Sequence, residues 1–154
     1  MALSTQFDLP GALPGSVSMQ LNYFYLDRLR SSITGADSRD QAGEVDFSRN
    51  KATLMTSYED GPFSLGFDVT YVGKAVFDRT AAANTYDQPR VGSWVGVDSH
   101  IAYTFNDKWT VRLIAENLFN RQAPWPIPVD DIGIASYSSA LLGRRFVMNV
   151  TADF

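Results

Sequence analysis

The chain has 154 residues, of which 45% are hydrophobic and 13% aromatic, and it has a formal net charge of −4 and no cysteine. The absence of cysteine excludes disulfides and cysteine metal sites, and the interspersed charges form no basic patch for a nucleic acid. No cofactor is indicated. No stretch approaches the ~20 apolar residues of a membrane helix, whereas a transmembrane β-strand needs only about 10 residues of alternating hydrophobicity.

Alternation of apolar and polar side chains predicts seven β-strands along the chain. They are expected near residues 4–9, 17–25, 51–58, 63–77, 95–105, 109–119 and 145–154. In the last strand, for example, Phe146, Met148 and Val150 share one face. Ile114 and Val147 depart from the pattern, because each is an apolar residue on the polar face of its strand.

The connections between these strands alternate in length. Short ones lie near residues 10–15, 59–62 and 106–107, and long ones near 31–44, 79–92 and 120–142. This is the asymmetry expected of short periplasmic turns and long external loops in a membrane barrel. The alternative, a soluble β-sandwich, also has alternating strands but gives no reason for the asymmetry.

Aromatic residues lie at the strand ends on the apolar face, as in the two interfacial girdles of a membrane barrel. Those beside the short turns are Phe7, Tyr58, Phe63, Phe105, Trp109 and Phe154, and those near the long loops are Tyr25, Phe77, Phe119 and Phe146. The predicted fold class is therefore all-β. We expect an antiparallel up-and-down transmembrane β-barrel segment of about seven strands, incomplete by itself because the sheet would have two open edges.

A motif near the end of the chain resembles a family signature. Glu116-Asn117-Leu118-Phe119-Asn120 resembles the E-N-L-F-[DN] sequence near the C-terminus of TonB-dependent receptors. Gly143, Arg144 and Phe146, with the terminal Phe154, resemble that family's last strand, whose apolar alternation and final aromatic are read by the barrel assembly machinery. The resemblance is best from about Val97 onward and extends more loosely to Phe7-Asp8-Leu9-Pro10.

The resemblance implies a function in the bacterial cell outer membrane. Members of the family combine a plug with a barrel of about 22 strands and import a scarce nutrient, such as a siderophore-metal chelate, another chelate or an oligosaccharide, driven by the TonB system. Residues 1–154 contain no plug and about seven strands, so we expect the C-terminal portion of such a barrel. The expected partners are outer-membrane lipid, the missing strands and plug of the same receptor, the TonB system acting through that plug, and the assembly machinery.

The first residues lack the positive start and apolar run of a signal peptide, so an exported protein would have lost its leader or be a fragment. A second hypothesis is a small stand-alone or oligomeric outer-membrane barrel that acts as an adhesin, a structural protein or a lipid-modifying enzyme. Catalysis is not expected, because His100 and Asp98 share one face while Ser99 points to the other, which does not assemble a nucleophile and its base.

The long loops contain the candidate ligand contacts. Trp125 and Tyr137 lie in the longest loop, which a Trp-Pro-Ile-Pro segment stiffens. Asp130 and Asp131 could help hold a divalent cation, but two adjacent carboxylates without a spaced ligand set are weak evidence, and a solvated loop is the favoured interpretation. The candidate contacts in external loops are Tyr86, Arg90, Trp125, Asp130, Asp131 and Tyr137.

Overall fold

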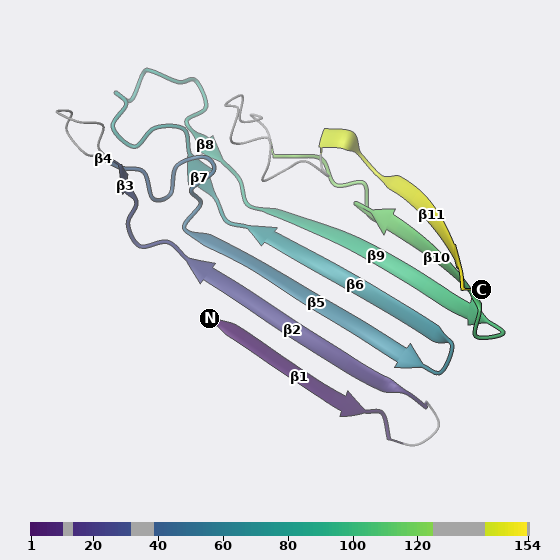
Figure 1. Cartoon of the computed structure of the whole chain (residues 1–154). Helices are drawn as coiled ribbons and strands as arrows, with labels where there is room; N and C mark the ends of the chain where they lie inside the picture. The colour runs from purple at the N-terminus through teal and green to yellow at the C-terminus, as the bar shows by residue number, and fades with distance from the viewer. Residues whose placement is uncertain (11–13, 32–38, 125–140, 154) are drawn as a thin grey trace.

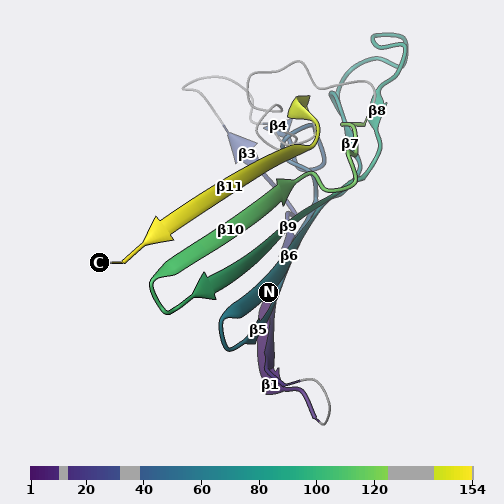
Figure 2. The same cartoon turned by 90° about the vertical axis from the view of Figure 1, so that its right-hand side faces the viewer.

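The protein forms one open antiparallel sheet, seen in a computed structural model that describes residues 1–10, 14–31, 39–124 and 141–153. The sheet has seven strands in the order β1-β2-β5-β6-β9-β10-β11, so the long strands pair with one another in the order in which they follow along the chain (Figure 1). Their bounds are Ala2–Asp8, Ser16–Tyr25, Asn50–Asp60, Phe63–Val72, Trp94–Phe105, Trp109–Glu116 and Arg145–Ala152. The seven predicted strands are confirmed. The sheet curves without closing, and β1 and β11 form its two edges (Figure 2).

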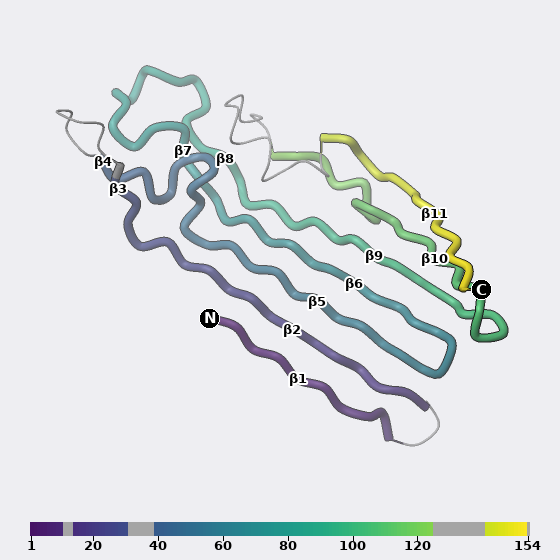
Figure 3. Tube along the Cα trace, viewed as in Figure 1, coloured from purple at the N-terminus to yellow at the C-terminus, as the bar shows by residue number. Residues whose placement is uncertain are grey.

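All the long connections leave from one end of the sheet and all the short turns from the other, as the tube in Figure 3 shows. At the long-loop end, two small ribbons add to the architecture: β3 (Arg30–Ser31) pairs with β4 (Arg39–Asp40), and β7 (Ala75–Val76) with β8 (Arg90–Val91). Periodicity could not predict them, because a two-residue strand has no period. Within the described ranges there is no helix long and apolar enough to cross a membrane.

Two strands end at least three residues earlier than the sequence predicts. The fourth was expected to reach Phe77, but β6 ends at Val72, and after Gly73, whose amide still donates to the carbonyl of Asn50 at 2.8 Å, the chain leaves the large sheet to pair with β8. A Cβ on Gly73 would lie 2.9 Å from that same carbonyl oxygen, so the close approach requires glycine. The sixth was expected to reach Phe119, but β10 ends at Glu116 because the next residue, Asn117, has a positive φ of 51°.

The strand register joins the apolar faces of all seven strands into one surface. One row runs across β1, β2, β5, β6 and β9 through Leu3, Leu21, Leu54, Val69 and Val97. The neighbouring row on the other face contains Asn22, Thr53, Thr70 and Gly96. A shift of one residue in any pairing would place apolar side chains on the polar face, so the alternation specifies this register.

The apolar surface is exposed rather than packed. Phe146 and Met148 on the edge strand are 72% and 65% exposed, and Ile101 near the middle of the sheet is 42% exposed. A soluble monomer rarely exposes a contiguous apolar face of this kind. Lipid chains satisfy such a face in a membrane barrel, where the other face, lined by polar side chains, forms the interior.

The two apolar residues that break the alternation face each other. Ile114 of β10 is directly opposite Val147 of β11 on the polar face, and His100 of β9 is the partner of Ile114 on its other side. The departures therefore form a small apolar cluster at one edge of the interior rather than an error in register. Cross-strand apolar contacts of this type contribute roughly 0.2–1 kcal/mol each.

Among the described residues, fully buried apolar side chains gather at the long-loop end in two small clusters. Val72 and Trp94 pack with Ala123, and Trp94 also covers Gly96, where an added Cβ would collide with the indole ring. The second cluster contains Val45, Ala75 and Val91, with Phe77 packed against it. The loops therefore have a packed base of their own.

Phe77 was predicted to belong to the girdle of aromatics at the strand ends, and that assignment is wrong. Its ring packs on the second loop cluster and stacks on Tyr86, with the ring centroids 5.5 Å apart and an interplanar angle of 26°. The error follows from the early end of β6, which takes Phe77 out of the strand. At the short-turn end, Phe105 and Trp109 are about half exposed, as a girdle requires.

The two faces predict opposite effects of the same substitution. Leu113→Arg, near the middle of the apolar face, should destabilise the barrel in a lipid bilayer by about 2–4 kcal/mol, because a charge at mid-membrane must be desolvated. Thr53→Arg on the polar face should change stability by less than about 1 kcal/mol. Guanidinium titration of the assembled barrel in vesicles measures both, and equal losses for the two variants would contradict the assignment of the faces.

Candidate functional site

Asn117 is a bulge that ends β10 and redirects the chain. Its backbone amide donates to the carboxylate of Asp98 at 2.7 Å, and the amide of Leu118 then donates to the carbonyl of Val97. Glu116 and Asn117 together therefore oppose a single residue of β9, which is how a β-bulge bends a strand. Asparagine suits this position because, among residues other than glycine, it tolerates a positive φ comparatively well.

The side chain of Asn117 also closes the turn that follows. It is 1% exposed; its Oδ1 accepts from the amide of Arg121 at 2.7 Å, and its Nδ2 donates to the carbonyl of the same residue at 3.0 Å. Both polar atoms of the buried amide are thus satisfied by one backbone unit. The turn carries the chain toward Trp94, because Ala123, two residues after Arg121, packs on the first loop cluster.

Other residues of the motif fasten the last strand to this corner. Asn120, also at positive φ, accepts a hydrogen bond at its Oδ1 from the amide of Arg144 at 3.0 Å. Arg145 pairs with Glu116 across the hairpin, with 2.9 Å between Nε and Oε2. The guanidinium of Arg144 lies over the ring of Phe146, 5.7 Å from its centroid. The segment Glu116–Asn120 thus forms a structural corner between β9, β10 and β11.

A network of ion pairs holds the first two long loops together. Arg39 pairs with Glu44 and Asp78, in both cases at 2.9 Å, and Arg79 pairs with Asp40 at 3.3 Å. Glu44 is buried, and its second oxygen accepts from the backbone amide of Arg79. The buried carboxylate is therefore satisfied by two donors from different loops. The network fixes the loop between β2 and β5 against the loop between β6 and β9.

Backbone and side-chain donors lower the pKa values of two acids of this network, Asp78 and Asp40. Hydrogen bonds from the hydroxyl and amide of Thr80 lower the pKa of Asp78 to about 2. Hydrogen bonds from the backbone amides of Leu29 and Ala42 lower the pKa of Asp40. In turn, the hydrogen bond to Asp78 raises the pKa of Arg39.

The same loops enclose a hollow of about 820 Å³ at the long-loop end of the sheet. We call it the loop hollow; it lies between the segment 42–50 and the hairpin β7–β8. Its charged lining residues are Arg49, Lys74, Asp78, Arg79 and Arg90. Its walls are tied by backbone hydrogen bonds, from Val45 to Val76, from Val76 to Gly43 and from Phe77 to Pro89.

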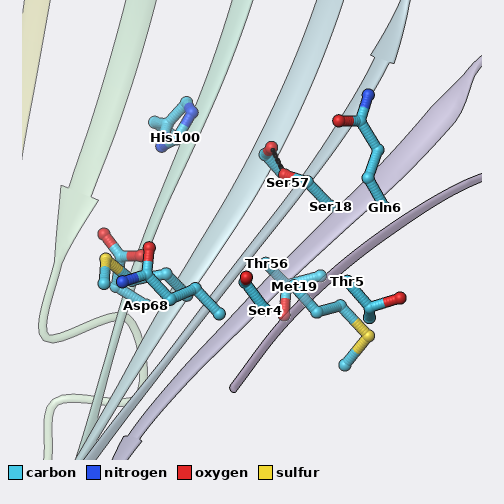
Figure 4. Close-up of a pocket in the computed structure, with 11 residues that line it drawn as sticks. Ser4, Thr5, Gln6, Ser18, Met19, Thr56, Ser57, Asp68 and His100 are labelled. Atoms are coloured by element: carbon cyan, nitrogen blue, oxygen red, sulfur yellow. Dashed lines mark hydrogen bonds between the residues drawn. The ribbon is translucent and has the colours of Figure 1, made fainter. Parts of the chain in front are cut away.

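A second hollow, of about 350 Å³, lies on the polar face of the sheet near the short-turn half of β1 (Figure 4). Ser18 and Ser57 share a hydrogen bond there at 2.7 Å, and His100 lies two strands beyond Ser57, with Gly66 between them. An added Cβ at Gly66 would collide with the imidazole, so His100 covers that glycine. The lining combines polar side chains, such as Gln6 and Asp68, with those of Met19 and Met55.

This hollow does not assemble a nucleophile with its base. Ser99 is on the apolar face, opposite Phe67 and Ala115, while His100 is on the polar face. The carboxylate of Asp98 accepts the amide of Asn117 instead of orienting the histidine. Within the described part of the chain, His100 has no hydrogen-bonded serine, and no three acidic or histidine side chains gather as a metal site.

The predicted ligand contacts do not all come together. Arg90 lines the loop hollow, whereas Tyr86 does not and packs on Phe77. The other four candidates, Trp125, Asp130, Asp131 and Tyr137, lie outside the described residues, as does Phe154. Gly143 adopts a positive φ of 71° just before the last strand. Phe119 is 71% exposed at the start of the longest loop.

Sequence reasoning missed Arg49, Lys74 and the ion-pair network. Nothing in the local pattern indicates that the segment 39–49 folds onto residues 76–80, because two long strands, β5 and β6, separate these segments in the sequence. The one available signal was the density of charge in both loops, with Arg39, Asp40 and Glu44 in the first and Asp78 and Arg79 in the second.

Comparison with known families agrees with this architecture. The family model described as "TonB dependent receptor-like, beta-barrel" matches residues 2–118, roughly three quarters of the chain. The match begins in β1 and ends at Leu118 inside the motif, so it covers the earlier strands where the resemblance of the sequence was looser. No curated protein and no solved structure matches the chain.

The corner predicts a measurable difference between two asparagines at positive φ. Asn117→Ala should cost about 2–4 kcal/mol, because it adds backbone strain of ~1 kcal/mol to the loss of a buried, fully bonded amide. Asn106→Ala in the exposed β9–β10 turn is the matched control and should cost only the strain. Asn117→Gly should avoid the backbone strain of about 1 kcal/mol but still lose the hydrogen bonds of the buried amide. Denaturant titration of the assembled barrel measures all three, and equal losses at 117 and 106 would contradict the role of the side chain.

The ion-pair network predicts a loss of loop order at low pH. The pKa of Asp78 is lowered from 3.8 to about 2, so its contribution is present above pH 3.8 and is lost as pH falls toward 2. Protection of the Thr80 amide, which donates to Asp78 at 2.7 Å, should decline in that window when corrected for intrinsic exchange. Asp78→Asn should abolish the decline and Asp87→Asn should not. Protection that is lost already near neutral pH would contradict the assignment.

Proposed function

The chain belongs to the TonB-dependent receptor-like β-barrel family, and we propose that it forms the C-terminal part of the barrel wall of an outer-membrane receptor for a scarce nutrient. The observation that carries this proposal is the open seven-stranded sheet with one continuous exposed apolar face and one polar face. The apolar face suits outer-membrane lipid, and the polar face suits a lumen that holds a plug.

The direction of the edge strands supports an incomplete barrel. In an antiparallel sheet of seven strands, β1 and β11 run in the same direction. Joining β11 to β1, within one copy or around a ring of copies, would make a parallel seam, whereas bacterial outer-membrane barrels are antiparallel throughout with an even number of strands. An antiparallel pairing of β1 with β1 of a second copy would turn that copy upside down in the membrane.

The partner that fits both edges is therefore an odd number of further strands. Such a partner would satisfy the unpaired backbone groups of β1 and β11, which lipid cannot do. In the family, the remainder of the same receptor would supply these strands together with the plug through which the TonB system acts. The same reasoning disfavours the small stand-alone or oligomeric barrel. In this proposal the barrel assembly machinery would recognise β11, the last strand, by its alternating apolar residues.

The transported molecule in this proposal is a chelate, such as a siderophore-metal complex, or an oligosaccharide. The long loops would make the first contact with it, since they emerge from the end of the barrel opposite the periplasmic turns. The family consists of receptors and transporters, and we propose no catalytic step for this chain. The role of the corner around Asn117 would be to hold the longest loop over the wall near Trp94.

Uptake that depends on both the receptor and TonB tests this function. Cells that make the receptor should accumulate one labelled nutrient from a panel of iron chelates, cobalt and nickel chelates and oligosaccharides. Deleting either the receptor or TonB should abolish that accumulation, whereas binding to the cell surface should survive the loss of TonB. A nutrient taken up equally well without TonB would contradict the proposal.

The alternative makes a different prediction in the same strains. A stand-alone barrel would fold from the 154-residue chain alone in lipid vesicles and would show a folded band on gels that shifts on boiling. The proposal expects no such band until the remaining strands of the barrel are supplied.

A further inference from the structure

The loop hollow has a positive charge that the protein does not neutralise. Lys74 and Arg90 are exposed, and neither has a hydrogen bond or ion pair in the described part of the chain. The guanidinium of Arg49 donates to the carbonyls of Leu26 and Asp27, at 3.3 and 2.6 Å, and these neutral acceptors leave its charge in place. Three cationic side chains thus line one hollow. Lys74 and Arg90 have no acidic partner in the described part of the chain, and Arg49 forms no ion pair there although its charge helps to lower the pKa of Asp40.

The acidic side chains near the hollow form ion pairs with other arginines. Asp78 is the acidic residue among those that line the hollow, and it pairs with Arg39. Arg79, the fourth cation of the lining, is neutralised by Asp40. Because the chain as a whole has a net charge of −4, this local excess of positive charge is opposite in sign to the protein around it. Walls of low dielectric constant focus such a field into a concave site.

The hollow is also preorganised, because its walls are packed and hydrogen-bonded without a ligand. Its floor contains Ala75 and Val91, both buried, and backbone hydrogen bonds tie the segment 43–45 to β7. Cations displayed on such a frame lose little freedom when a ligand binds, and the entropic cost of binding falls accordingly. Its volume of about 820 Å³ lies in the range of sites for small molecules.

We propose that the loop hollow binds an oxygen-rich polyanion, with carboxylate or phosphate groups, through Lys74, Arg90 and Arg49. Guanidinium groups suit such ligands because they present paired N–H donors to two oxygens, and the ammonium of Lys74 adds a mobile point charge. Insofar as this polyanion is the transported nutrient, the inference rests on the proposed function and narrows its substrate to an anionic ligand. A neutral oligosaccharide does not use this charge.

Two sources can present this chemistry at the outer surface of a bacterium. One is a soluble polyanion such as a carboxylate-rich chelate, and the other is the phosphate of an outer-leaflet lipid. The experiment therefore uses citrate and tripolyphosphate as soluble probes, and neutral vesicles with or without lipid A as the lipid probe. The complete receptor, purified in a zwitterionic detergent, is titrated with each probe.

The double variant Lys74→Gln/Arg90→Gln should bind the soluble probes about tenfold more weakly than the unaltered receptor, or worse, since two charge-assisted contacts are lost. Its matched control is Arg28→Gln/Arg30→Gln, which removes the same charge from exposed residues at the same end of the sheet, outside the hollow, and should leave affinity within about twofold. If lipid A displaces the soluble probes from the unaltered receptor but not from the double variant, lipid phosphate is the source. Failure of lipid A to displace them would identify a soluble ligand.

Two results would overturn the inference: absence of saturable binding to a folded receptor, or an equal loss in the control pair. The titration needs neither TonB nor transport, so it fails independently of the proposed function. Binding without TonB-dependent uptake would leave the anion site standing and remove the function. TonB-dependent uptake of a nutrient by a receptor that binds no polyanion would support the proposed function and remove the anion site.

Discussion

The alternation of side chains between two faces, fixed by one register across seven strands, is the constraint on which the rest of the structure depends. The rows that cross the sheet are mostly apolar on one side, with exceptions such as Thr56 and Ser99, and mostly polar on the other. The two faces therefore require two different environments. Lipid can cover the first, and the second needs a filled or hydrated lumen, which is why this thin sheet has almost no core of its own.

Burial is concentrated instead where the chain leaves the sheet. Val91, Asn117 and Ser48 are the largest side chains with almost no exposure, and all three lie at or beyond strand ends. Each performs a local task, as when Ser48 donates to the carbonyl of Gly73 at 2.8 Å and secures the break after β6. The loops are consequently positioned by packed and hydrogen-bonded corners, and a ligand site built on them can be preorganised although it lies outside the sheet.

The sequence predicts the sheet well because its signal is local. A period of two within each strand locates Val17 or Phe67 on the correct face without knowledge of the partner strand. The limits appear where long-range contacts decide, as after Val72, where the chain leaves β6 to pair with β8 and Phe77 packs on the loops instead of in the expected girdle. The site was less predictable. Arg90 was found by its place in a long loop, whereas Arg49 and Lys74 join it only through the folding of two loops onto each other.

The segment around Asn117 illustrates how a few consecutive residues fix the chain where it leaves the sheet. The bulge fixes the first residues of the longest loop against Asp98 and directs the chain onto Trp94 through Ala123. The loops of β2–β5 and β6–β9 are fixed by a different device, in which acids pair internally with Arg39 and Arg79. Because those carboxylates pair with Arg39 and Arg79, Lys74 and Arg90 in the loop hollow are left without an acidic partner among the described residues.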